Sequence, residues 1–273
     1  MVNNRQMKPI KQGAAVILGA LAALSAAQAS PAATDTKKAA ATPAANSLTS
    51  AEKAAGWRLL FDGKTTNGWR GHKMDAFPKV RWVVEDGTIH RTANQQPKEQ
   101  EWDLVTVDKF DNFDLRWEWK VGPRGNSGLK YLIDEAMATK KQDEGIGFEY
   151  QMLDDDLHPD AKKGIDGNRR TGSLYDLIPA AKEKVLHPAG QWNDSRVLVD
   201  GNHIEHWLNG IKVLSFERGS PEFKKLIAAS KFKDIAGFGD VARGLILLQD
   251  HGDEAWFRSL KLRVLPKPTA AQK

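Results

Sequence analysis

The chain of 273 residues contains no cysteine. This absence excludes disulfide bonds, thiolate zinc sites and a lipidated cysteine anchor, so a core of ordinary size must hold the fold together. Long hydrophobic runs are missing as well. The apolar run at residues 14–24 is shorter than the roughly 20 residues that a membrane-spanning helix needs.

Familiar catalytic and nucleotide-binding motifs are also missing. No glycine-rich nucleotide motif and no HExxH zinc motif occurs. The stretch GNSGL at 125–129 lacks the final glycine of a serine-hydrolase elbow and precedes a predicted strand. The net charge is +5, and three of the cations lie in the first 29 residues. Because no basic stripe is interleaved with aromatic residues, the sequence predicts no nucleic-acid partner.

The amino terminus has the pattern of an export signal. Arg5, Lys8 and Lys11 precede the short apolar run, and Ala27-Gln28-Ala29 offers a cleavage site between small residues. These features are typical of a secretory signal peptide over residues 1–29. They predict a periplasmic or secreted protein with no membrane span after cleavage. A retained membrane anchor is the alternative, which the shortness of the apolar run disfavours.

Composition divides the rest of the chain into three parts. Residues 30–50 are rich in alanine, proline, threonine and serine and predict a disordered linker. Residues 51–265 carry the periodic patterns of one folded domain, and residues 266–273 predict a frayed tail.

Short strand signals dominate the domain. Asp86-Gly87 and Asn209-Gly210 each join two β-rich runs and predict hairpin turns. Residues 113–121 alternate between apolar and charged side chains. One short helix is expected after Ser220-Pro221, where serine can cap and proline suits the first turn. These signals predict an all-β jelly-roll sandwich of two antiparallel sheets, with residues 153–195 as a long loop insertion.

The stretch GFEYQMLDDDLHPDAK at 147–162 holds the densest set of reactive side chains. In a strand, Glu149 and Gln151 share one face and the apolar residues share the other. That polar face is either a hydrated surface or a ligand-binding surface. The aspartates that follow do not have the spacing of a calcium loop. We therefore expect Asp155, Asp156 and Asp160 to be solvated.

Other candidates lie far away in the sequence. His251 and Gln249 stand at the end of a predicted strand, and Lys130 follows a turn that contains Asn126. Each histidine also has a plain structural explanation as a surface residue or a satisfied core residue.

Seven blocks occur in an order that resembles one family of carbohydrate-active proteins. They are WRLLFDGKTTNGW, WVVEDGTIH, GNSGLKY, GFEYQMLDDDLHPDAK, TGSLYDLIPA, WNDSRVLVDGNHIEHWLNG and GLILLQDHGDEAWFRSLKLR, within residues 56–264. The family is that of the 3-keto-disaccharide hydrolases, also described as 3-keto-glucoside-1,2-lyases and 3-keto-2-hydroxyglucal hydratases and earlier as domain of unknown function 1080. The resemblance implies a concanavalin A-like jelly roll that acts on oxidised glycosides, and an upstream sugar 3-oxidoreductase that makes the ketone.

The implied reaction assigns roles to the candidates. A ketone at C3 acidifies the C2 hydrogen, so the site needs a base, an electrophile for the enolate and an acid for the leaving oxygen. We expect Glu149, His158, His251 and Lys130 to be catalytic. The two histidines are the leading base and acid or metal ligands, Lys130 is the electrophile for the ketone or its enolate, and Glu149 binds the sugar or a metal. One divalent metal ion could be held by Glu149, His158 and His251. Expected substrate-binding residues are Gln151, Asp154, which could orient a histidine, Tyr175, which could close over the substrate, Trp207, Gln249 and Asn126.

Three alternatives stay open from the sequence. Glu149 with Glu118 or Glu205 could form the carboxylate pair of an ordinary glycosidase. The sandwich could be a lectin-like sugar-binding module without chemistry. It could also be a structural protein in which the acidic loop is only solvated.

Overall fold

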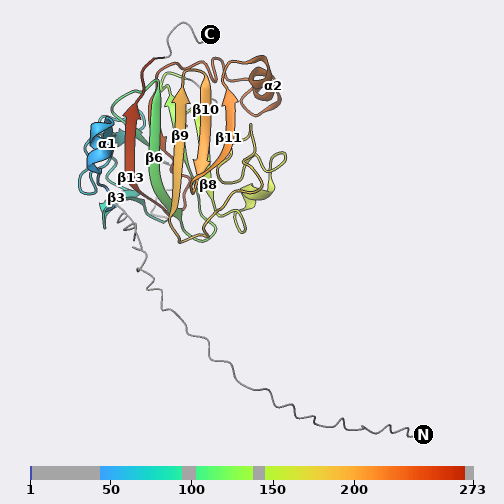
Figure 1. Ribbon diagram of the computed structural model, residues 1–273, viewed down its shortest axis with the longest axis horizontal. Helices are drawn as coiled ribbons and strands as arrows, with labels where there is room; N and C mark the ends of the chain where they lie inside the picture. Colours follow the sequence, from blue (N-terminus) through green and yellow to red (C-terminus); the bar gives the residue numbers. More distant parts are fainter. Residues whose placement is uncertain (2–43, 94–102, 138–144, 268–273) are drawn as a thin grey trace, which may run out of the picture. The chain divides into compact units, whose positions relative to one another are not determined.

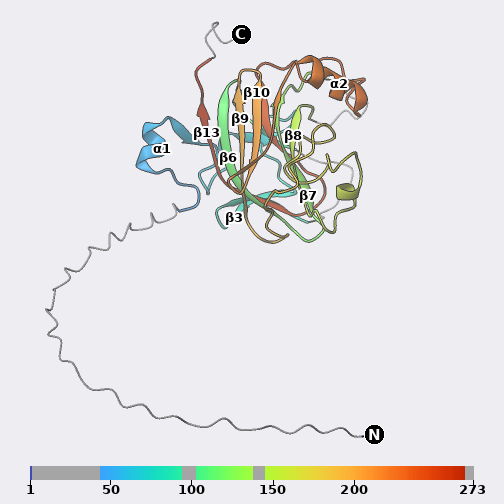
Figure 2. The same ribbon diagram turned by 45° about the vertical axis from the view of Figure 1, so that its right-hand side comes forward.

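The computed structural model describes residue 1 and residues 44–93, 103–137 and 145–267. Two antiparallel sheets lie face to face and form the predicted jelly-roll sandwich, so the all-β prediction is confirmed (Figure 1). Figure 2 shows β7 and β8 as a second layer beside β6, β9 and β10. No helix in these described ranges is long and apolar enough to cross a membrane.

Sheet A has the order β11-β10-β9-β6-β13-β4-β3, with β1 paired to β13, and sheet B has the order β2-β5-β12-β7-β8. The strands of sheet A are β1 (Trp57–Leu59), β3 (Trp82–Glu85), β4 (Thr88–Arg91), β6 (Phe113–Val121), β9 (Asn193–Asp200), β10 (His203–Leu208), β11 (Ile211–Glu217) and β13 (Ala255–Val264). Those of sheet B are β2 (Trp69–Gly71), β5 (Leu104–Thr106), β7 (Asn126–Ile133), β8 (Phe148–Leu153) and β12 (Leu245–Leu248).

The core between the sheets follows the alternation in the sequence. Trp117 of β6 is buried and meets Tyr150 of β8 edge to face, with ring centroids 5.0 Å apart. His206 of β10 lies in the same layer, where it hydrogen-bonds the Tyr131 hydroxyl at 2.8 Å and the Gly172 carbonyl at 3.1 Å. Burial lowers the pKa of His206 to about 3. It is therefore a neutral, satisfied core histidine.

The two predicted hairpin turns are present. Asp86 and Gly87 have φ values of 46° and 72°, and Asn209 and Gly210 have values of 47° and 80°. Positive φ at both central residues matches the twist of paired strands, and asparagine, aspartate and glycine tolerate it best.

Helices are few, and one of them was not predicted. Helix α2 (Pro221–Ala229) begins after the Ser220 cap, as expected. Helix α1 (Ser50–Ala54) begins at Thr49 with a capping box to Glu52. The expected linker therefore ends too late at residue 50, because Asn46 already bonds the Gly87 carbonyl at 2.8 Å.

The predicted insertion is an irregular segment between β8 and β9. It contains one 3-10 turn, η1 (Pro159–Lys162), in residues 154–192, hereafter the insertion. The expectation that Asp155 and Asp160 are solvated is wrong, since both are buried. Asp155 pairs with Lys184 at 2.7 Å, and Asp160 accepts a hydrogen bond from the Tyr175 hydroxyl at 2.9 Å. Buried charges need such partners, and here the partners lie within the insertion, so these contacts stabilise its conformation.

Candidate functional site

The outward face of sheet B collects most of the predicted site residues. Strand register sets Gln151 opposite Gly128 and Glu149 opposite Lys130. The Gln249 amide of the next strand donates to the Gly128 carbonyl at 2.9 Å. Since Tyr131 and Tyr150 fill the core, their strand neighbours point the other way. The outer-face row is Asn126, Lys130, Glu149, Gln151 and Gln249.

This face is not a hydrated surface. Glu149 is 6% exposed, Gln151 1% and Lys130 2%. Polar side chains are rarely buried to this extent without a structural or functional partner. The burial of Glu149 and Gln151 argues against the alternative of a hydrated surface.

The backbone of Gly128 lies directly against the side chain of Glu149. A Cβ atom at Gly128 would lie 2.7 Å from Glu149 Oε1, closer than a carbon and an oxygen can approach. The missing side chain thus lets the carboxylate lie over β7.

Changing Gly128 to alanine is expected to lower kcat/KM at least about tenfold, because displacing a reacting group by about 1 Å is costly. The fold should survive, since Gly128 does not have a positive φ. Gly122→Ala is the matched control, because its Cβ would meet no atom closer than 3.4 Å. Equal turnover of the two variants would show that the position of Glu149 is unimportant.

Lys130 and Glu149 form a buried ion pair across the two strands. The Nζ atom lies 3.8 Å from Glu149 Oε2 and donates to the Gly145 carbonyl at 3.2 Å. Their side chains are 3% and 7% exposed. A cation held in such a dry place interacts strongly with a developing negative charge.

Asp103 lies at this end of the row, although it belongs to no motif that the sequence analysis identified. The backbone amide of Asp250 donates to its carboxylate at 2.8 Å, and the amide of Gly145 does so as well. Burial raises the pKa of Asp103 from 3.8 to about 6, even though the charge of Lys130 opposes the shift. Asp250 is itself neutralised by Arg91 at 2.6 Å and Arg81 at 3.4 Å.

The raised pKa of Asp103 makes a testable contribution to stability. Between about pH 4 and pH 6 the folded protein keeps the Asp103 proton while the unfolded chain releases it. Stability from this group is therefore lost as the pH rises through that window. In Asp103→Asn this loss is absent, so the melting temperature of the variant relative to the wild type should be higher at pH 7 than at pH 4.5. Parallel pH profiles would contradict the assignment.

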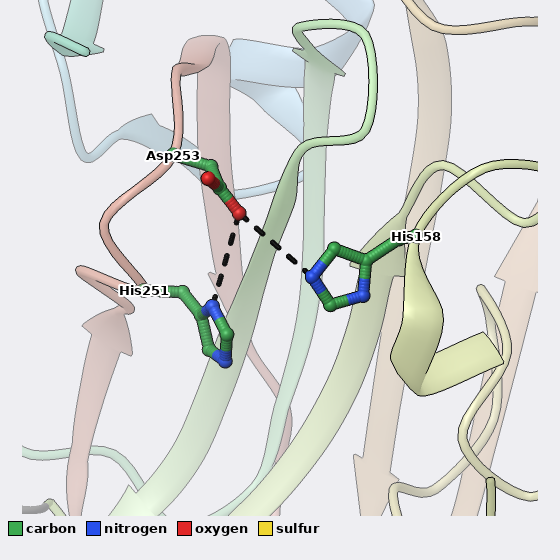
Figure 3. Close-up of side chains that lie close together, drawn as sticks. All are labelled: His158, His251 and Asp253. Carbon is green, nitrogen blue, oxygen red and sulfur yellow. Dashed lines mark ion pairs between the residues drawn. The ribbon is translucent and has the colours of Figure 1, made fainter. Parts of the chain in front are cut away.

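A second group lies at the other end of the row, in the histidine cluster of His158, His251 and Asp253 (Figure 3). Asp253 Oδ2 is 3.9 Å from His158 Nε2 and 3.9 Å from His251 Nδ1. Asn126 joins this cluster to the row. Its backbone amide donates to Asp253 at 3.0 Å, and its side-chain amide nitrogen lies 3.2 Å from His251 Nε2.

Hydrogen bonding fixes the proton of His158. The Asp160 amide donates to His158 Nδ1 at 3.1 Å, so the neutral ring carries its proton on Nε2, facing Asp253. Burial and the charge of His251 lower the pKa of His158, which favours this neutral form.

The same hydrogen bond bears on the predicted divalent ion. A histidine that binds metal usually donates a proton from its other ring nitrogen, whereas Nδ1 of His158 accepts one. Glu149, the third predicted ligand, pairs with Lys130, and the residue that meets both histidines is Asp253. The donor set as it stands fits hydrogen bonding to a ligand better than it fits a metal ion.

Two other residues predicted to bind substrate, Asp154 and Tyr175, form hydrogen bonds with the insertion or its neighbouring turn. The Asp154 carboxylate accepts from the amides of Arg124, Asp156 and Leu157 and holds a turn, rather than orienting a histidine. The Tyr175 hydroxyl donates to Asp160, and burial and the charge of Glu149 raise its pKa, so it stays a hydrogen-bond donor beside the row.

Trp207 lies on the wrong sheet for this site. Since His206 of the same strand is in the core, Trp207 and Glu205 point outward from sheet A, where the indole donates to Glu205 at 2.8 Å. The expected carboxylate pair of Glu149 with Glu205 is thereby separated by both layers of the sandwich. Glu118 pairs with Arg258 on that same outward face and is equally remote.

Known proteins match this chain along the whole sandwich. The model of the 3-keto-alpha-glucoside-1,2-lyase-like domain matches residues 56–263. A 3-keto-disaccharide hydrolase of Bacteroides thetaiotaomicron is 39% identical over 232 residues, which cover 78% of this chain and 79% of that protein.

Two solved structures from Parabacteroides distasonis, both of candidate glycosyl hydrolases, share the fold. One has a TM-score of 0.72 at 35% identity and covers 81% of this chain and 100% of its own. The other has a TM-score of 0.57 at 25% identity and covers 77% of this chain and 99% of its own. The similarity thus includes the strands that carry the row.

Proposed function

This chain belongs to the family of 3-keto-alpha-glucoside-1,2-lyase-like domains, and from that premise we propose that it is a carbohydrate hydrolase that cleaves the glycosidic bond of 3-keto-glycosides. The relative in Bacteroides thetaiotaomicron supports the substrate class. The buried polar face of sheet B supports catalysis over a lectin-like or purely structural role, because a sugar-binding surface has no need of a buried ion pair and two coupled histidines.

The proposed reaction is an elimination followed by hydration. A base removes the C2 proton, and the electrons of that bond form an enolate with the C3 ketone. The enolate expels the C1 substituent, whose oxygen takes a proton from an acid. Water then adds across the new C1–C2 double bond, with hydroxyl on C1 and hydrogen on C2, and gives the free 3-keto sugar.

The order of groups along β7 is the observation that carries this proposal. Lys130 lies at one end, Glu149 lies over Gly128 in the middle, and the histidine cluster adjoins Asn126 at the other end. The reacting atoms of the sugar, the C3 oxygen, C2 and the C1 oxygen, follow one another in the same order. Each two-residue step on the strand is about 7 Å, within reach of side chains around one ring.

The roles follow from this order. Lys130 stabilises the charge that develops on the C3 oxygen. Glu149 takes the C2 proton and, as the resulting carboxylic acid, returns it to the leaving oxygen, to which His158 donates a hydrogen bond from Nε2. His251, Gln151, Gln249 and Asn126 position the sugar. No step needs the divalent ion.

A second mechanism has one specific observation in its favour. Glu149 and Asp103 both interact with Lys130, and the pKa of Asp103 is raised to about 6, as in the general acid of a glycosidase. These two carboxylates, rather than the expected pair with Glu118 or Glu205, would serve an ordinary hydrolysis.

A time course in D2O followed by NMR separates the mechanisms. We expect turnover of a 3-keto-glucoside with deuterium entering C2, no turnover of the unoxidised parent glucoside, and the same rates with EDTA. Turnover of the parent without exchange would establish the two-carboxylate mechanism. Loss of activity with EDTA would show that the reaction depends on a divalent metal ion. Binding without turnover would establish a sugar-binding module.

Two further parts of the proposal concern the cell. The signal-like amino terminus supports export to the periplasm or the medium. The substrate requires a sugar 3-oxidoreductase upstream, since the ketone must be made before this enzyme can act.

A further inference from the structure

An open cleft of about 1300 Å³ adjoins the turn at Asp154. Its walls are the insertion, the ends of β6 and β9 and the middle of β11. Asp154, Asp155 and Asp156 line it, whereas no member of the outer-face row or of the histidine cluster does. The cleft is therefore separate from the site described above.

The walls of the cleft are rigid. Lys184 pairs with Asp155 at 2.7 Å and donates to the Thr171 carbonyl at 2.6 Å. Asn193 accepts from the His187 amide at 2.9 Å and from the Asn209 side chain at 2.8 Å. A preformed hollow costs little ordering when a ligand enters it.

Side chains of the cleft walls still have hydrogen-bond donors and acceptors available for a ligand. The ammonium of Lys184 has three N–H groups, and the hydrogen bonds above use two of them, so among the described residues one is left. His187 donates from Nδ1 to the Trp192 carbonyl at 2.7 Å, so its Nε2 is an acceptor. Between these groups lie apolar surfaces of Leu186 and Pro188.

The charges of the cleft favour a neutral ligand. Four aspartates and three cations line it, and the two most buried aspartates are already satisfied by the protein. No single sign is left to attract an anion or a cation. Scattered donors and acceptors above small apolar surfaces suit a molecule with hydroxyl edges and C–H faces.

We propose that this cleft is a second saccharide-binding site, which takes a neutral oligosaccharide. Its volume exceeds the upper range of roughly 1,000 Å³ for ordinary ligand pockets, so it has room for several sugar rings. It differs from the catalytic face in having no buried ion pair between adjacent strands and no paired histidines.

Calorimetric titration of the purified protein with maltotriose and with cellotriose tests the proposal. At least one trisaccharide should bind in the millimolar range. Ala189 lines the cleft, and Ala189→Trp places a large ring in it without removing a charge. This variant should weaken binding at least about tenfold. Ala242→Trp, an exposed position outside the cleft, is the matched control and should bind normally.

Two results would overturn the proposal. One is the absence of binding by both trisaccharides. The other is binding that survives Ala189→Trp but is lost in Glu149→Gln, which would assign it to the outer-face row. Turnover of a 3-keto-glucoside by Ala189→Trp should equal that of the wild type, so the outcome for the cleft is independent of the proposed reaction.

Discussion

Glu149→Gln is expected to lower kcat on a 3-keto-glucoside by about 10³-fold, within the range that general base catalysis contributes. Glutamine keeps the shape of the side chain but cannot take the C2 proton. Its neutral amide also removes the carboxylate charge that lies 3.8 Å from Lys130 Nζ in the native protein. Steady-state kinetics and the rate of C2 deuterium exchange measure the effect, and both should fall together.

Glu205→Gln is the matched control for this variant. Glu205 is also largely buried and bonded, but it lies on the outward face of sheet A with Trp207 and Lys212. Its replacement should leave kcat within about threefold of the wild type, because both layers of the sandwich separate Glu205 from the outer-face row. If both variants lose activity equally, the loss in Glu149→Gln reports damage to the fold. If Glu149→Gln stays active, another group is the base.

The fold could be predicted because its signals are local. Hairpin turns at 86–87 and 209–210 depend on two residues each, and the alternation of β6 depends on its own nine residues. Helix α1 was not predicted, although Thr49 and Glu52 have the spacing of a capping box. The alanine, proline, threonine and serine content of residues 30–50 predicted a disordered linker there, and this composition was given more weight than the short capping signal.

The candidate site could be predicted only in part. Alternation alone places Glu149 and Gln151 on one face of a strand, but it does not reveal which strand lies beside it. The pairing of β7 with β8 and β12 is long-range information that the sequence does not state. Asp103 was missed for this reason, because it reaches the site through contacts with residues 145 and 250. Asp253, two residues after His251, could have been found from that spacing.

Trp207 shows the opposite error. The sequence correctly paired it with Glu205 on one face and His206 on the other. It could not tell which sheet would carry the ligand, since each sheet of a sandwich has one outward face. An aromatic residue beside a carboxylate suits a sugar site and equally suits the cation-rich surface where Arg196 lies 5.2 Å from the indole ring.

Lys130→Met is expected to lower kcat by about 10²-fold, because the charge on the C3 oxygen then develops without a cation beside it. Methionine preserves the length and the apolar stem of lysine, so the strand can pack as before. The pKa of Asp103 should rise further, since the charge of Lys130 holds it down in the native protein. The pH profile of the melting temperature should therefore show the loss of stability from Asp103 extended above pH 6.

Lys212→Met separates this effect from a general loss of charge. Lys212 also bonds a glutamate, at 3.1 Å, but its side chain is 45% exposed on sheet A. Both its rate and its pH profile should match the wild type. A Lys130→Met variant that is slow but keeps the native pH profile would mean that Lys130 acts on the substrate without influencing Asp103. An active Lys130→Met variant would instead mean that another donor on this face stabilises the enolate, such as an amide of the row or the histidine cluster.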